Sequence, residues 1–77
     1  MTTVQQEVVN YLEETLSTKI ELENNLYDDL KLDSLDVIEL NIMLEEKFNI
    51  VIEDDFIKNI LTVQELINKI RSKFGLD

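Results

Sequence analysis

The chain has a single glycine, Gly75, and no proline, so the two residue types that most strongly interrupt regular backbone structure are nearly absent. β-Sandwiches and barrels need such residues at their many turns, whereas helices are favoured by their absence. The 77 residues are enough for one small domain, which buries only about 60% of the surface that its unfolded chain exposes. The sequence therefore predicts a small all-α domain with a thin core.

Two segments have the spacing of a capping box, in which a threonine hydroxyl caps an amide three residues later and that later side chain reaches back. They are Thr3-Val4-Gln5-Gln6 and Thr62-Val63-Gln64-Glu65. The first predicts a helix that ends near Leu16, and the second predicts a last helix that ends at Gly75, a typical C-terminal cap. Apolar residues recur at helical spacing in both segments: Val4, Val8, Leu12 and Leu16, then Val63, Leu66, Ile67, Ile70 and Phe74.

A third main helix is predicted between these two. It begins after Asp33, which is a favourable N-cap residue, and ends at about Phe48 or Asn49. Asp36 adds a second carboxylate near the positive end of this helix, where negative charge is stabilising.

Two less regular segments complete the chain. Asp54 or Asp55 is predicted to cap a short fourth helix that includes Phe56, Ile57, Ile60 and Leu61. Residues 18–33 show no sustained period, and an irregular stretch of this length is often functional. The expected fold is a small four-helix bundle, with three main helices, one short helix and a long first loop.

The helix after Asp33 has two apolar stripes, because successive residues turn by about 100°. The stripe predicted to face the core consists of Val37, Leu40, Leu44 and Phe48. The opposite stripe consists of Leu35, Ile38 and Ile42, flanked by Glu39, Glu45 and Glu46. A thin domain cannot bury both faces of one helix, so we expect this second stripe to be an exposed docking strip for another protein. In the alternative, Leu30 and Leu32 fold the first loop over the strip.

The chain is strongly acidic, with a formal net charge of -10. Ten acidic residues and two lysines lie between Asp28 and Asp55, so this stretch holds -8 of that charge. Such a surface repels nucleic acid and anionic lipid head groups, and it steers basic protein partners toward the helix after Asp33. The same repulsion between like charges favours a monomer.

The chain contains no histidine and no cysteine, which excludes the commonest general bases, thiol nucleophiles and metal cages. An enzyme is therefore the least favoured class.

An EF-hand is also excluded in the window from Asp28 to Glu39, because Leu30 and Leu32 stand where calcium ligands are needed and Asp33 replaces the turn glycine. We expect the acidic clusters to bind divalent cations weakly, with no specific metal site.

The N-terminal residues 1–16 contain three glutamates and no basic residue. No apolar run approaches the roughly 18 residues of a membrane span. We therefore expect neither a leader segment nor a span, and a cytoplasmic location, with which the absence of cysteine agrees.

Ser34 directly follows the predicted N-cap Asp33, at the end of the long loop. The segment Asp29-Leu30-Lys31-Leu32-Asp33-Ser34-Leu35-Asp36-Val37-Ile38-Glu39-Leu40, followed by Leu44-Glu45-Glu46-Lys47-Phe48, closely resembles the acyl carrier protein family. The resemblance extends over essentially the whole chain, including the long loop, the threonine motif before the last helix and the acidic bias. Asp-Ser-Leu alone is a weak motif, and the specificity comes from the extended match. The resemblance implies one acyl-carrier-like domain, 1–77.

In that family the serine of Asp-Ser-Leu-Asp carries 4'-phosphopantetheine, which implies this role for Ser34. A phosphopantetheinyl transferase would attach the group from coenzyme A, and its terminal thiol would hold an acyl group as a thioester. The chain would be a carrier without catalytic residues, serving acyl-transferring, synthase or ligase enzymes with basic docking patches. The pathways implied are fatty-acid, polyketide or related specialised biosynthesis.

The resemblance also assigns roles to the residues around Ser34. Docking to the transferase and partner enzymes would use Asp33, Leu35, Asp36, Ile38, Glu39, Ile42, Glu45 and Glu46. A cleft that shelters the acyl chain would be lined by Leu40, Met43, Leu44, Phe48, Ile57 and Ile67. Asp33 and Asp36 are assigned to docking because their charge would oppose the phosphate.

The sequence departs from the family pattern at two places. Lys31 stands where many members have a glycine, which predicts a loop of different shape before Ser34 because lysine disfavours positive φ. Glu53 stands near the place of a proline that often follows the second helix.

Two alternatives remain open at this level. In the first alternative, the chain is a peptidyl or D-alanyl carrier. The acidic helix and the leucine after Ser34 favour an acyl cargo over this alternative. In the second it is an acidic helical interaction module that carries nothing, and it would be indifferent to Ser34→Ala.

Overall fold

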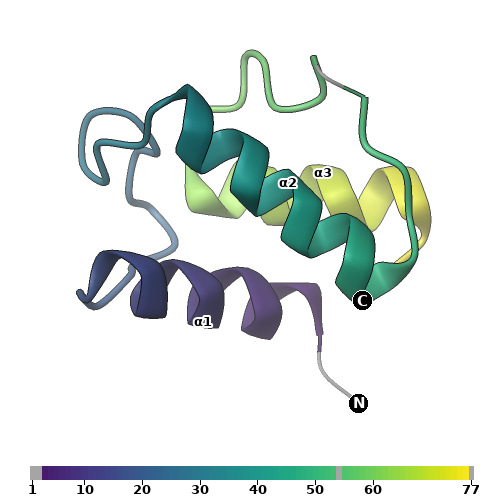
Figure 1. Cartoon of the computed structure of the whole chain (residues 1–77), viewed down its shortest axis with the longest axis horizontal. Helices are drawn as coiled ribbons and strands as arrows, with labels where there is room; N and C mark the ends of the chain where they lie inside the picture. The colour runs from purple at the N-terminus through teal and green to yellow at the C-terminus, as the bar shows by residue number, and fades with distance from the viewer. Residues whose placement is uncertain (1–2, 54, 77) are drawn as a thin grey trace.

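The computed structural model describes residues 3–53 and 55–76. Three α-helices occur within these residues: α1 (Val4–Leu16), α2 (Ser34–Phe48) and α3 (Val63–Phe74). α1 contacts both α2 and α3, and Figure 1 shows the long first loop at one end of the three helices, where α2 begins. The all-helical prediction is therefore confirmed, and the bounds of the three main helices agree with their sequence signals.

Each helix begins with a reciprocal capping box. The two threonine boxes form as predicted, with Thr3 paired to Gln6 and Thr62 paired to Glu65. α2 has a third box, which the sequence reading treated only as an N-cap with a nearby carboxylate. All three helices end in a left-handed residue that stops the helical hydrogen bonding, namely Ser17, Asn49 and Gly75.

The predicted short helix over 55–61 is not present as an α-helix. Three overlapping turns replace it, in which the amides of Phe56, Lys58 and Ile60 each donate to a carbonyl three residues earlier, at 3.0–3.1 Å. Asn59 has φ of 71°, which interrupts helical backbone. A helix of so few residues gains little from cooperativity, whereas this turn segment buries Phe56, Ile57 and Ile60. Asp54, the alternative cap, lies outside the described residues.

The turn segment is held against α3 by aromatic and cationic contacts. The rings of Phe56 and Phe74 lie 5.8 Å apart. The Lys69 ammonium donates to the Phe56 carbonyl at 2.8 Å and also lies 4.8 Å from the centre of that ring. These contacts secure a segment that lacks helical hydrogen bonds of its own.

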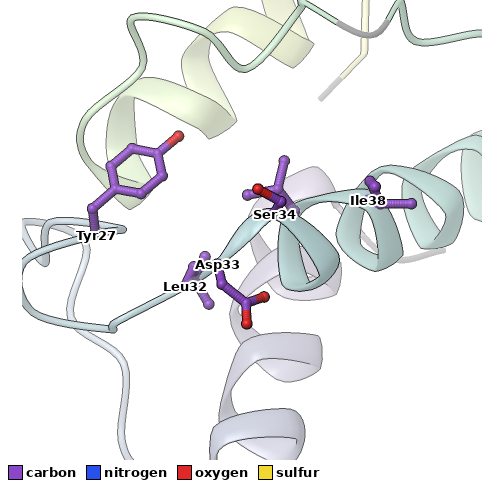
Figure 2. Close-up of a pocket in the computed structure, with 6 residues that line it drawn as sticks. Tyr27, Leu32, Asp33, Ser34 and Ile38 are labelled. Carbon is purple, nitrogen blue, oxygen red and sulfur yellow. The ribbon is translucent and has the colours of Figure 1, made fainter.

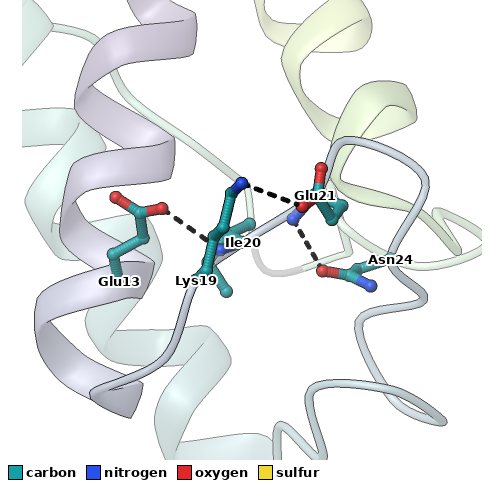
Figure 3. A network of polar contacts seen from close by, with 5 residues as sticks. All are labelled: Glu13, Lys19, Ile20, Glu21 and Asn24. Atoms are coloured by element: carbon teal, nitrogen blue, oxygen red, sulfur yellow. Dashed lines mark hydrogen bonds and ion pairs between the residues drawn. The ribbon is translucent and has the colours of Figure 1, made fainter.

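The long first loop has no regular period, but hydrogen bonds tie it both to α1 and to the residue before the cap of α3. Near α1, the Ile20 amide donates to the Glu13 carboxylate at 3.2 Å, and the Glu21 amide donates to the Asn24 side chain at 2.7 Å (Figure 3). Near α3, the Leu26 amide donates to the Leu61 carbonyl at 2.8 Å. The loop is therefore part of the fold and holds the start of α2 in place.

The last turn of this loop has an unexpected backbone conformation at Lys31, whose φ is 58°. Lys31 thus adopts the left-handed conformation that a glycine would favour, although lysine disfavours it. The expectation that lysine would avoid positive φ at this position was wrong. The buried neighbours Leu30 and Leu32 explain this, because packing both side chains in the core determines the path of the backbone between them.

The left-handed conformation of Lys31 leads to a stability prediction. Lys31→Gly is expected to be more stable than Lys31→Ala by about 1 kcal/mol. Alanine in the left-handed region destabilises the folded state by about 1–2 kcal/mol, and the greater conformational entropy of glycine in the unfolded chain offsets part of this difference. The corresponding difference in melting temperature is about 4–8 °C for a domain of this size. Both variants remove the same charge, so thermal unfolding compares the backbone effect alone. Equal melting temperatures would show that Lys31 is not left-handed in solution.

Candidate functional site

The site is built around Ser34, the first residue of α2. Its side chain is exposed and comes directly after the N-cap Asp33. The capping box of α2 does not use the serine: the Asp36 amide donates to the Asp33 carboxylate at 2.9 Å, and the Asp33 amide donates to the Asp36 carboxylate at 3.0 Å. Figure 2 shows the Asp33 carboxylate pointing away from the Ser34 hydroxyl. The hydroxyl therefore stands free at a rigid helix start.

An open pocket with a volume of about 470 Å³ lies beside this hydroxyl. Its lining comes from the long loop up to the N-cap Asp33 and from the first turns of α2 (Figure 2). The lining residues are Tyr27, Leu32, Asp33, Ser34, Val37 and Ile38. The lining combines the polar side chains of Tyr27, Asp33 and Ser34 with the apolar side chains of Leu32, Val37 and Ile38, so the pocket can accept a group that has both a polar and an apolar part.

Sequence reasoning missed three of these lining residues. No site role was predicted for Tyr27 or Leu32, which lie in the long loop, and Val37 was predicted to lie on the stripe of α2 that faces the core. Leu32 is buried, whereas Tyr27 is exposed and Val37 is half-buried. A tyrosine within an otherwise aliphatic and acidic loop was the one available signal. The loop's path was needed to bring it beside Ser34.

The predicted exposed strip is confirmed as a surface feature. Leu35, Ile38 and Ile42 are 61%, 53% and 48% exposed, respectively, while Leu40 and Leu44 on the opposite face of α2 are fully buried. The alternative, in which the first loop folds over the strip, is wrong because Leu30 and Leu32 turn into the core instead. The strip begins beside Ser34, and Ile38 belongs to both the strip and the pocket.

The acidic residues around the strip differ in their surroundings. Glu39 and Glu46 are exposed and free to meet a partner. Glu45 is half-buried, and its carboxylate accepts a hydrogen bond from the Ile52 amide at 2.8 Å, which ties the end of α2 to the chain that follows. Asp33 and Asp36 serve the helix cap. Docking therefore stays a prediction for all five. Three of them also have a structural role: the N-cap role of Asp33 was predicted, whereas the return bond of Asp36 and the Ile52 contact of Glu45 were not.

The six residues predicted to line an acyl cleft belong to the core. Leu40, Leu44, Ile57 and Ile67 are buried, and Met43 and Phe48 pack partly buried against them. None of the six lines the pocket beside Ser34. Their role toward an acyl chain stays a prediction, and it requires the core to open between the helices.

A second open pocket, also of about 470 Å³, lies between the turn segment and α3 and is lined by Lys58, Asn59, Ile60, Glu65, Asn68 and Lys69. Over residues 3–53 and 55–76, no three acidic side chains gather closely enough to hold a metal ion. Among the helices of these same residues, none is both long and apolar enough to cross a membrane.

Comparison with known proteins identifies the family. Residues 6–70 match the family described as a phosphopantetheine attachment site. An acyl carrier protein of Trieres chinensis is 44% identical over 57 residues, which are 74% of this chain and 71% of that protein. An acyl carrier protein of Thermobifida fusca is 32% identical over 65 residues, 84% of this chain and 82% of the other. Taken with the free serine at the start of α2, these matches show that the chain belongs to the phosphopantetheine-binding acyl carrier protein family.

Proposed function

We propose that this protein carries acyl groups as thioesters on a 4'-phosphopantetheine arm joined to Ser34 by a phosphodiester. The observation that supports this most directly is the exposed Ser34 hydroxyl at the first residue of α2, free of the capping box and beside an open pocket. The family match supplies the cofactor. The attachment residue is inferred from this geometry.

The residues at the site fit the arm chemically. Ser34 supplies the oxygen that forms the new bond to phosphorus, while the bond from that phosphorus to the nucleotide part of coenzyme A breaks. The chain has no histidine that could take the serine proton, so the transferase must supply the base. The arm supplies the thiol that a chain without cysteine lacks. Helix-start amides favour the added negative charge.

The cargo class is inferred from the relatives and from α2. The relatives that match are acyl carrier proteins, and α2 presents an apolar strip between exposed acidic residues. We assign the cargo to acyl groups of fatty-acid, polyketide or a related specialised biosynthesis rather than to aminoacyl or peptidyl groups.

The same surface is proposed to recognise the partner enzymes. Leu35, Ile38 and Ile42 would be buried in the encounter, and Glu39 and Glu46 would meet basic side chains at its rim. Most of the net charge lies in this part of the chain, which steers a basic enzyme to the end of α2 that carries Ser34.

Steering by the rim predicts a salt-dependent rate. The double variant Glu39→Gln and Glu46→Gln is expected to slow loading by a basic transferase several-fold at low ionic strength, and by much less at high salt, where charges are screened. The measurement is the second-order loading rate across a range of salt concentrations. The control is Glu14→Gln with Glu23→Gln, which changes the net charge equally at exposed positions away from α2. Equal slowing in both double variants would mean that only the overall charge matters.

The test of the carrier function is the intact mass of the purified protein after incubation with coenzyme A, magnesium and a broad-specificity phosphopantetheinyl transferase. The expected result is a gain of one phosphopantetheine per chain. No gain by a demonstrably folded sample would contradict the proposal. In that case the exposed strip and its acidic rim would favour a helical interaction module that carries nothing.

A further inference from the structure

Tyr27 is the one aromatic side chain at the pocket beside Ser34. Its side chain is 39% exposed, although it stands next to the fully buried Leu26. Figure 2 shows its ring leaning over the pocket from the long loop, with the hydroxyl directed toward the side where Ser34 lies. Among the described residues, no protein group accepts a hydrogen bond from this hydroxyl. An amphipathic side chain is thus displayed at the site with its donor unused.

Hydrogen bonds order the backbone that carries Tyr27. The Asn25 side-chain oxygen accepts hydrogen bonds from the amides of Tyr27 and Asp28, both at 2.8 Å. The Leu26 carbonyl accepts from the Leu32 amide at 3.0 Å. The loop is therefore closed on itself directly before Ser34. Because the loop backbone is already ordered, only the Tyr27 side chain loses conformational freedom when the ring binds a ligand.

The charges near Ser34 decide which kind of group can contact a phosphate there. Asp28, Asp29, Asp33 and Asp36 surround the serine in sequence, and Lys31 is the one basic residue between Asp28 and Lys47. These carboxylates would repel the negative charge of a phosphate on Ser34, and no cluster of basic side chains in this stretch would offset that repulsion. A neutral hydroxyl donor directed into the pocket can bind a phosphodiester oxygen without needing a counter-charge.

We propose that Tyr27 is a contact residue for the phosphate end of the arm. This rests on the proposed function of Ser34. The phenol hydroxyl donates a hydrogen bond to the phosphodiester, and the ring, with Val37 and Ile38, packs against the pair of methyl groups that follows the phosphate in pantetheine. The Tyr27 hydroxyl and the apolar side chains of Val37 and Ile38 border the same pocket as Ser34, so both parts of an arm on Ser34 find a matching group there. Tyr27 thereby holds the base of the arm against the loop and directs the remainder along α2.

The test uses the loaded protein and two NMR observables. In the loaded parent, nuclear Overhauser contacts are expected between the Tyr27 ring protons and the two methyl groups of the arm. Loaded Tyr27→Phe is expected to keep these contacts, because the ring remains, but to change the ³¹P chemical shift of the phosphodiester. Loaded Tyr27→Ala is expected to lose both the contacts and the parent's ³¹P shift.

Tyr11→Phe is the matched control, since it removes the other tyrosine hydroxyl of the chain from α1 and should leave both observables unchanged. A ³¹P shift that is the same in the parent and Tyr27→Phe, with no ring-to-methyl contact in the parent, would overturn the role of Tyr27 while Ser34 loading stands. Failure of the folded parent to gain phosphopantetheine would overturn the proposed function itself, and the role of Tyr27 with it.

Discussion

Ser34→Ala is expected to abolish the attachment of phosphopantetheine completely. The serine oxygen is the atom that would bond to phosphorus, and alanine offers no replacement for it. The fold should remain intact, because the Ser34 hydroxyl takes no part in the capping box of α2 and alanine is a good helix former. The measurement is intact mass after exhaustive loading, with circular dichroism on the same sample.

The matched control for this substitution is Ser72→Ala. Ser72 is also an exposed helical serine, but it lies on α3, so this variant should gain one phosphopantetheine like the parent. If Ser34→Ala still gained the group, the attachment would lie at another hydroxyl. If folded Ser34→Ala and folded parent both gained nothing, the carrier proposal itself would fail.

Leu44→Ala is expected to cost about 2–5 kcal/mol of unfolding free energy, the usual range for a buried leucine. Leu44 is fully buried in the core. A domain of this length has a total stability of only about 4–12 kcal/mol, so this one substitution removes a large share of it. Ile42→Ala should cost less than about 1 kcal/mol, because Ile42 is exposed on the docking strip.

Urea unfolding of both variants measures this difference. The two residues lie two positions apart on α2, so they share one helix and differ in the face that they occupy. The midpoint should fall sharply for Leu44→Ala and only slightly for Ile42→Ala, at a similar slope with denaturant. Equal losses would contradict the assignment of one face of α2 to the core and the other to the surface.

Local signals in the sequence were sufficient to predict the three main helices, whereas the role of Ser34 was inferred from the family resemblance over the whole chain. Capping boxes and left-handed end residues act over three or four positions, so Thr3, Thr62 and Gly75 mark helix ends without reference to the rest of the fold. The two stripes of α2 are also visible locally, because helical geometry places Leu44 and Ile42 on different faces of any helix that contains them.

The walls of the site depended on contacts between segments far apart in the chain. Tyr27 lines the pocket beside Ser34 from a loop whose Leu26 amide donates to the Leu61 carbonyl, 35 positions later, and no periodicity encodes such a bond. The same applies to Glu45, whose carboxylate is engaged by the Ile52 amide rather than left at the surface.

The tertiary structure also overruled local preference in two segments. Lys31 takes a left-handed conformation against its intrinsic preference, since Leu30 and Leu32 are both drawn into the core. Residues 55–59 form turns where the sequence predicted a helix, because burying Phe56 and Ile57 stabilises the domain more than one short run of helical hydrogen bonds would. Helix starts and faces were thus local properties of the sequence. The path of the loops, and with it the pocket beside Ser34, was decided by which apolar side chains the thin core could bury.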